Sequence, residues 1–318
     1  MRANLQKYIY ISILFVLIGN PAYALTNFAK ATIVVLDESN NPVEGAYTGI
    51  TFEKNTSQGT KVTTEDGSTD SIGKFTATGS CNGHIAYGAK KAGYYDSYYT
   101  YDFKGKNTFG WEPWNPELKV ILRKIENPVP MYARHAKIEL PVSEKDVGFD
   151  LVEYDWVIPY GKGKYSDFIF NLKRDFTAWN EQNTELMIKL SNEYDGIILH
   201  EVNRRVGSVF KLDRYAPDIN LKNELKLVIN AHNGVWKTNV KNTDNYYFRI
   251  RSQKKDGKFY QSMYGKILGH LDFSPVNSKT AIIVFKYYVN PDYTRNLEFD
   301  PKRNLFDNIS DLERVTEP

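Results

Sequence analysis

Cysteine is almost missing from this sequence: Cys81 is the only one among 318 residues. An intramolecular disulfide is therefore excluded, and each folded unit must be stable on its own hydrophobic core. Histidine is sparse as well, and none of the five has the spacing of a zinc motif such as His-Glu-x-x-His. We expect no cofactor.

An excess of charge of one sign is also missing. The 41 Lys and Arg residues stand against 38 Asp and Glu residues, which gives a formal charge of +3. Arg2 and Lys7 fall in a segment that we expect to be removed, and losing these two charges leaves the chain near +1. A chain so close to neutral lacks the electrostatic footprint of a nucleic-acid-binding protein.

Long apolar runs are absent after the first residues. Residues 8–18 form an apolar stretch behind the basic residues Arg2 and Lys7, and Pro21-Ala22-Tyr23-Ala24 ends in a small-x-small pattern. This arrangement predicts a signal peptide over residues 1–24. The alternative is a retained anchor, but the run is shorter than the ~20 residues that span a bilayer. We therefore expect a secreted or periplasmic protein with no transmembrane segment after cleavage.

Aromatic residues, in contrast, are abundant: they make up 14% of the chain, with 23 Tyr and 17 Phe. Aromatic and β-branched residues favour strands, and residues 30–36, 47–53, 74–78 and 117–124 each have the composition or alternation of a short strand. Turn-forming residues separate them at regular intervals. About seven such segments over residues 28–124 predict a seven-strand sandwich.

The turns of this region carry a resemblance to a known family. The residues concerned are Asp37, Asn41-Pro42-Val43-Glu44-Gly45-Ala46, Asp66-Gly67, Asp70 with Gly73-Lys74-Phe75, Asn82-Gly83-His84 and Ala92-Gly93-Tyr94. In order and spacing, this segment resembles the carboxypeptidase regulatory-like, or transthyretin-like (prealbumin-like), Ig-like domain. It departs from that pattern by an insertion at residues 107–115 and by two competing Asp-containing turns. The resemblance implies a scaffold or binding role and no peptidase activity.

The rest of the chain is predicted to form a second all-β unit. Pro128 and Pro130 predict a stiff linker over residues 125–134, which separates a domain at 25–124 from one at 135–318. The clearest signal in the second domain is a hairpin, residues 246–252 and 258–267, around the turn Asp256-Gly257. We expect a sandwich or jelly-roll, because no amphipathic helix of useful length is evident.

One aromatic cluster is the best candidate for a ligand-binding site. It comprises Tyr98, Tyr99, Tyr101, Trp111 and Trp114, of which the tryptophans fall in the polar insertion. Tyrosine and tryptophan rings offer a flat apolar face with a polar edge, which suits sugar rings and protein partners. The alternative is that these rings pack between the domains or across strands.

Three other sets of residues are weaker candidates. The first is a metal or acid–base site formed by His200, Glu201, His232 and His270 with Asp272. The second is a glycosidase carboxylate pair among Asp150, Glu153, Asp155 and Glu201. The third is a calcium-binding loop with Glu65, Asp66 and Asp70. Sequence spacing fits none of the known motifs, and ordinary loop, strand and Asx-turn roles account for the same residues.

Binding is therefore favoured over catalysis. The sequence predicts a secreted or envelope-associated binding protein whose ligand is a polysaccharide, the cell envelope or a protein partner, with no nucleic acid involved. Two alternatives stay open: a hydrolase with its site in the second domain, and a structural subunit of an envelope assembly.

Overall fold

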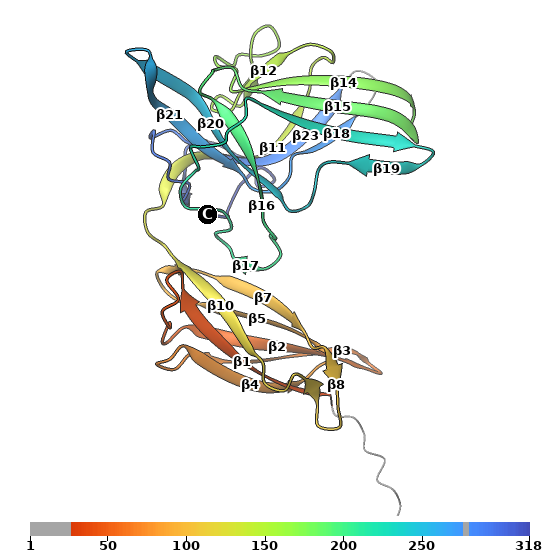
Figure 1. The fold of residues 1–318 in the computed structure, drawn as a ribbon, viewed down its shortest axis with the longest axis vertical. Coiled ribbons are helices and arrows are strands. Elements are labelled where there is room, and N and C mark those ends of the chain that lie inside the picture. The colour runs from red at the N-terminus through yellow and green to blue at the C-terminus, as the bar shows by residue number, and fades with distance from the viewer. Residues whose placement is uncertain (1–26, 276–279) are drawn as a thin grey trace, which may run out of the picture.

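The structure of the chain is a computed structural model, which describes residues 27–275 and 280–318. Strands are its only regular elements within those ranges, so the all-β prediction is confirmed. The predicted signal peptide lies outside the described residues. No helix in the described part of the chain is long and apolar enough to cross a membrane. Figure 1 shows two bodies of sheet, one built from the red-to-yellow part of the chain and the other from the green-to-blue part.

The first body is a β-sandwich of two main sheets. One sheet has the order β4 (Lys74–Ser80), β1 (Phe28–Asp37), β10 (Glu117–Lys124) and β6 (Tyr94–Tyr95). The other has the order β17 (Gly207–Ser208), β7 (Ser97–Asp102), β5 (His84–Lys90), β2 (Tyr47–Thr56) and β3 (Gly59–Ser68). The short hairpin β8 (Gly105–Lys106) and β9 (Trp111–Glu112) closes one end.

Alternation along the strands builds the core of this sandwich. Ile33 and Val35 of β1 and Ile50 and Phe52 of β2 are fully buried, while the residues between them face outward or toward the edges. Such a period of two is expected where one face of each sheet is buried. Buried Cys81 belongs to the same core.

The second body is also a sandwich. Its larger sheet has the order β16 (Gly196–Glu201), β20 (Asp244–Lys255), β21 (Lys258–Ile267), β23 (Ala281–Asn290), β11 (Val129–Glu139) and β24 (Phe299–Asn304), with β22 (Asp272–Pro275) on β23. The facing sheet has the order β13 (Asp155–Trp156), β12 (Val147–Asp150), β14 (Phe168–Ala178), β15 (Glu181–Lys189), β18 (Glu224–His232) and β19 (Val235–Thr238). The hairpin predicted around Asp256-Gly257 is confirmed as β20 and β21, and both turn residues have positive φ.

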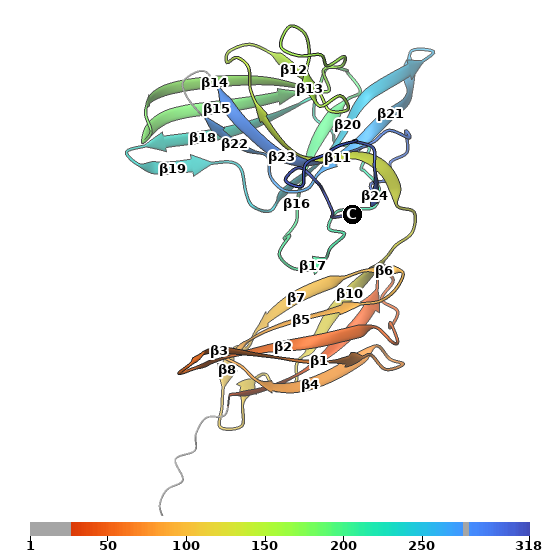
Figure 2. The same cartoon turned by 180° about the vertical axis from the view of Figure 1, so that it is seen from behind.

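The residues predicted as a linker, 125–134, are partly strand. β11 begins at Val129, whose amide donates to the carbonyl of Glu298, and the strand then pairs with β23 from Tyr132 onward. Pro130 is tolerated because it lies at the start of the strand, where the register with β24 is broken. The segment that leads from β10 of the first body to β11 of the second is therefore only the short stretch before Val129, as both views show (Figures 1 and 2).

A second connection joins the bodies. β17 comes from a long loop of the second body, yet it extends the five-stranded sheet of the first, with Gly207 opposite Tyr98 and Ser208 opposite Ser97. The amide of Val209 also donates to the carbonyl of Asp96 at 2.8 Å. This strand covers an edge that would otherwise be open, and it fixes the sheet face next to the junction (Figure 1).

Candidate functional site

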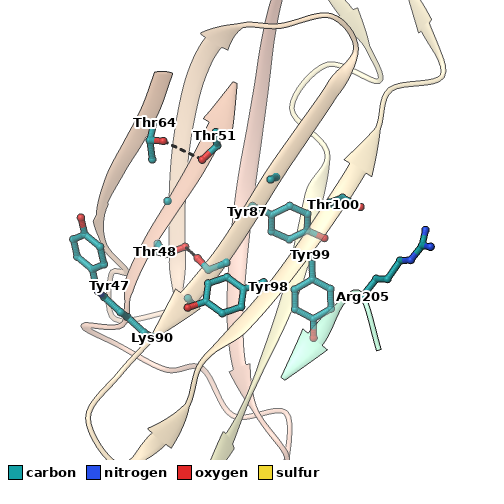
Figure 3. A pocket seen from close by; sticks show the side chains of 14 residues that line it. Tyr47, Thr48, Thr51, Thr64, Tyr87, Lys90, Tyr98, Tyr99, Thr100 and Arg205 are labelled. Carbon is teal, nitrogen blue, oxygen red and sulfur yellow. Dashed lines mark hydrogen bonds between the residues drawn. The ribbon is translucent and has the colours of Figure 1, made fainter. Parts of the chain in front are cut away.

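A groove runs across the outward face of the five-stranded sheet in the first body, close to β17. Its volume is about 340 Å³. Gly49, Gly88 and Tyr98 form its floor. They belong to one cross-sheet row, which in register order contains Asp66, Gly49, Gly88, Tyr98 and Gly207. Three of the five positions are glycine, so between Asp66 at one end and the Tyr98 ring this row has little side-chain volume. We call this hollow the tyrosine groove (Figure 3).

Tyr98 lies closely against the glycine beside it. A Cβ atom at position 88 would come within 2.9 Å of Cδ1 of Tyr98 and 2.5 Å of the carbonyl oxygen of Ser97. Only glycine allows this approach without displacement of the ring or the neighbouring strand. The Tyr98 ring is still 53% exposed, so it is available for contact with a ligand.

The hydroxyl of Tyr98 is anchored. It donates a hydrogen bond to Oδ2 of Asp96 at 3.0 Å. Burial raises the pKa of Tyr98 above its ordinary value, and the Asp96 carboxylate raises it further. The phenol therefore stays protonated at neutral pH, and its bond to Asp96 limits rotation of the ring.

The next rows on the same face of the sheet, on either side of the row that contains Gly49 and Gly88, form the walls of the groove. On one side, Nζ of Lys90 lies 5.0 Å from the centre of the Tyr47 ring. On the other side, Thr51 faces Thr64, with a hydrogen bond of 3.0 Å between their hydroxyls. Arg205 enters from the second body (Figure 3). The groove thus combines exposed aromatic rings with hydroxyl and cationic groups.

Of the five aromatic residues predicted from the sequence, only Tyr98 contributes an exposed ring to this groove. Tyr99 and Tyr101 alternate with Tyr98 along β7 and pack against the core instead. Tyr99 stacks on Tyr87 with a centroid distance of 5.6 Å, and both partly buried residues are also among those that line the groove. The pattern of adjacent tyrosines did not reveal this division, which follows from the pleat of the strand.

Trp111 lies in β9 and Trp114 follows just after it, and neither lines the tyrosine groove. Trp111 is half-buried on the core, and its Nε1–H donates to the carbonyl of Cys81 at 3.0 Å. Its ring also lies so close to Gly83 that a Cβ there would be 2.9 Å away. Trp114 is 47% exposed. The structure therefore does not bring the five predicted residues together.

The histidines are dispersed among separate partners. Nδ1 of His84 lies 2.6 Å from Asp102, and Nδ1 of His232 lies 2.6 Å from Glu181. The ring of His200 packs on Tyr247, while Glu201 pairs with Lys241. Within residues 27–275 and 280–318, no group of three or more His, Cys, Asp or Glu side chains is arranged to hold a metal ion.

The carboxylates proposed as an acid–base pair are held by structural partners. Asp150 is fully buried and lies 2.6 Å from Nη2 of Arg251, which also lies 2.7 Å from Asp167. Asp150 further accepts hydrogen bonds from the amides of Lys164 and Tyr165. Burial alone would raise the pKa of Asp150, but these donors and Arg251 lower it below its ordinary value. This carboxylate is ionised and fully engaged.

The loop considered for calcium has an Asx turn. Oδ1 of Asp70 accepts hydrogen bonds from the amides of Ile72 and Lys74, at 3.0 and 2.8 Å. Asp66 instead lies on β3, opposite Gly49. The two carboxylates therefore have separate surroundings.

A second hollow, of about 420 Å³, lies in the second body, and two predicted candidates, His270 and Asp272, are among the residues that line it. Sequence reasoning missed its tryptophans. Trp179 and Trp236, 63% and 52% exposed, are among the residues that line it. Phe176, Gln182, Ala231 and Trp236 form one row across β14, β15, β18 and β19. The alternation of β15 and β18 could have indicated this shared face, but pairing between distant strands was needed to see it.

Comparison with known proteins gives no family assignment. No family model matches the chain, and no curated protein matches it. Among solved structures, BcpA, the major pilin subunit of Bacillus cereus, is 8% identical with a TM-score of 0.23, covering 81% of this chain and 69% of that one. A variant of the shaft pilin SpaA from Lactobacillus rhamnosus GG is 10% identical with a TM-score of 0.23, and the match covers 80% of this chain and 92% of that one. A streptococcal ancillary pilin is 11% identical with a TM-score of 0.22, and the match covers 81% of this chain and 59% of that one. Likenesses at these TM-scores say nothing about function.

Proposed function

We propose that this chain is an exported, envelope-associated binding protein that binds polysaccharide in the tyrosine groove. One observation carries the proposal: the exposed ring of Tyr98 has glycine on both sides in its cross-sheet row, Gly88 and Gly207. A sugar ring can approach such an aromatic face without obstruction from neighbouring side chains. C–H groups of a pyranose pack well on an aromatic face, and nearby hydroxyl and amine groups satisfy its polar edge.

The export part of the proposal rests on the signal-peptide pattern of residues 1–24. We also propose that residues 25–124 form a domain of the carboxypeptidase regulatory-like type. The conformation of its turns supports this proposal, because Gly45 and Gly73 both have positive φ, at 65° and 74°. A Cβ at Gly73 would come within 2.5 Å of the carbonyl oxygen of Val35, so this turn needs glycine.

A binding assay on polysaccharide fractions tests the proposal. The chain from residue 25 onward is measured against insoluble and soluble polysaccharides from cell envelopes, together with Tyr98→Ala, Tyr98→Phe and Tyr160→Ala. Loss of a stacking ring lowers affinity by about 1–3 kcal/mol, or roughly five- to 150-fold, as base–aromatic stacking illustrates. We expect Tyr98→Ala to lose binding and Tyr98→Phe to keep most of it. Tyr160 lies in the second body, is 40% exposed, and serves as the matched control. Equal binding by wild type and Tyr98→Ala would refute the proposal.

The edge strand β3 favours a second candidate function, that of a structural subunit in an envelope assembly. This strand is ten residues long, ends the five-stranded sheet and is exposed along almost its whole length. An open edge can pair with a strand of another chain. Val62 in its middle is 56% exposed. If β3 mediates assembly, light scattering should show a concentration-dependent mass that Val62→Lys reduces, and a constant monomer mass would dismiss this candidate.

A further inference from the structure

A third hollow, distinct from the one lined by Trp179 and Trp236, adjoins the tyrosine groove at the junction of the two bodies. It has a volume of about 300 Å³ and shares two lining residues with the groove, Tyr98 and Arg205. Its other walls include Arg204, Lys211 and Lys286 from the second body. A ligand on the Tyr98 ring is therefore next to this hollow, which we call the cationic hollow.

The charges that line the cationic hollow are unbalanced. Its four cations are Arg204, Arg205, Lys211 and Lys286, and the carboxylate among its lining residues is that of Glu317. Lys286 pairs with Glu317 at 2.5 Å, so these two charges offset each other. Within residues 27–275 and 280–318, no carboxylate lies at ion-pair distance from Arg204, Arg205 or Lys211. Three positive charges thus lack an acidic partner there.

Two of these cations are held in place by the fold. The Arg204 guanidinium lies against Gly269, whose φ is +101°, and a Cβ at that position would be 2.6 Å from Nη1. Nε of Arg204 is buried without a hydrogen-bond partner. Nζ of Lys211 donates to the carbonyl of Val206 at 3.0 Å. Burial lowers the pKa of Lys211, and repulsion from Arg204 lowers it further, so these two charges lie close enough to interact.

We propose that the cationic hollow binds the acidic group of a polysaccharide, a carboxylate or a sulfate, while a neighbouring sugar ring of the same chain stacks on Tyr98. The inference rests on the proposed function and adds the class of ligand, an acidic polysaccharide. An anion there would offset the positive charges of Arg204 and Lys211, which line the same hollow. Arginine also offers a paired-donor geometry that matches a planar carboxylate.

The test compares two forms of one polymer. Binding of polygalacturonate and of its carboxyl-reduced, neutral form is measured by calorimetry at low and high salt. The proteins are wild type, Arg204→Gln/Lys211→Gln, Tyr98→Ala and the control Lys255→Gln/Lys258→Gln. The control pair lies at a hairpin tip, and its replacement changes the net charge by the same amount. A sulfated form of the neutral polymer and free sulfate distinguish a carboxylate from a sulfate and a polymer from a simple ion.

We expect wild type to bind an acidic form at least about tenfold more tightly than the neutral form, since hydrogen bonds to charged groups contribute about 1.5–3 kcal/mol each. The preference should shrink at high salt and disappear in Arg204→Gln/Lys211→Gln, but not in the control. Equal binding of acidic and neutral polymer by wild type would overturn this inference and leave the proposed function standing. Acidic binding that depends on Arg204 and Lys211 but not on Tyr98 would instead overturn the proposed function and keep the anion site. Tight binding of free sulfate with no binding of either polymer would overturn both.

Discussion

Nη1 of Arg214 lies 2.8 Å from Oε2 of Glu298, and this pair is at the centre of the junction between the two bodies. Arg214 is 8% exposed and Glu298 is fully buried. Arg214 also pairs with Glu38 of the first body at 3.2 Å, and Glu298 accepts a hydrogen bond from the Tyr95 hydroxyl at 2.9 Å. Each member of the pair therefore holds the first body as well as its partner, and together with β17 they fix the sheet that carries the tyrosine groove.

Replacement of Glu298 by alanine should destabilise the protein strongly. The change leaves the Arg214 charge without its most buried partner and the amides of Glu126 and Asn127 without their acceptor. Removal of one member of a buried ion pair costs about 3–5 kcal/mol. Urea or thermal unfolding measures the loss. Glu117→Ala is the control, because the Glu117–Lys74 pair is exposed and contributes about 0–1 kcal/mol. Similar losses in both variants would contradict the prediction.

The same carboxylate should make stability depend on pH. Burial would raise the pKa of Glu298, but hydrogen bonds from the amides of Asn127 and Glu126 and from Arg214 hold it below its ordinary value of 4.5. A pKa that is lowered in the folded state gives stability above the unfolded pKa, and that stability is lost as pH falls through the folded value. The free-energy difference between wild type and Glu298→Gln should therefore be constant near neutral pH and shrink below about pH 4.5. A difference independent of pH would contradict this assignment.

The glycine floor of the tyrosine groove predicts a specific sensitivity. Gly88→Ala puts a methyl group 2.5 Å from the carbonyl oxygen of Ser97 and 2.9 Å from the Tyr98 ring, so the ring must move. Overpacking of this kind costs about 1–3 kcal/mol. We expect a loss of both stability and polysaccharide binding. Gly105→Ala is the matched control, because a Cβ there meets nothing within 4 Å. Wild-type affinity in Gly88→Ala would contradict the prediction, because polysaccharide binding would then not depend on the position of the Tyr98 ring.

The fold class could be predicted from the sequence because its signals are local. Alternation around Ile33 and Val35 and the Asp256-Gly257 turn each fix a short stretch of backbone, and the structure has strands and a turn there. The end of the linker was harder to predict from the sequence, because Val129 becomes a strand residue through pairing with Phe299, which is far away in the sequence. Proline at position 130 indicated a break, but not how early the next strand begins.

The candidate site was harder to predict because it depends on register. The sequence showed Tyr98 within a tyrosine-rich run, but not that Gly49, Gly88 and Gly207 come from three other strands to lie in its row. Likewise, nothing local in the sequence shows that Arg205 reaches a sheet built from residues about a hundred positions earlier. The side chains that form the site are brought together by pairing between strands that are distant in the sequence. The local pattern of one sequence does not predict such pairing.

Trp111 and Trp114 should separate into a structural and an exposed residue. Trp111→Ala removes a half-buried ring from the core together with the hydrogen bond to the carbonyl of Cys81. We expect the free energy of unfolding to fall by about 3 kcal/mol, the low end of the ~3–5 kcal/mol range for truncation of a buried aromatic residue. Trp114→Ala changes a side chain that is 47% exposed, so a loss of only about 0.5 kcal/mol is expected. Unfolding curves and polysaccharide affinity are measured for both single variants and for Trp111→Phe, which keeps most of the ring. Because neither tryptophan lines the tyrosine groove, the affinity of folded Trp114→Ala should equal that of wild type. Weaker binding by that variant at unchanged stability would place a second ligand contact beside the β8–β9 hairpin.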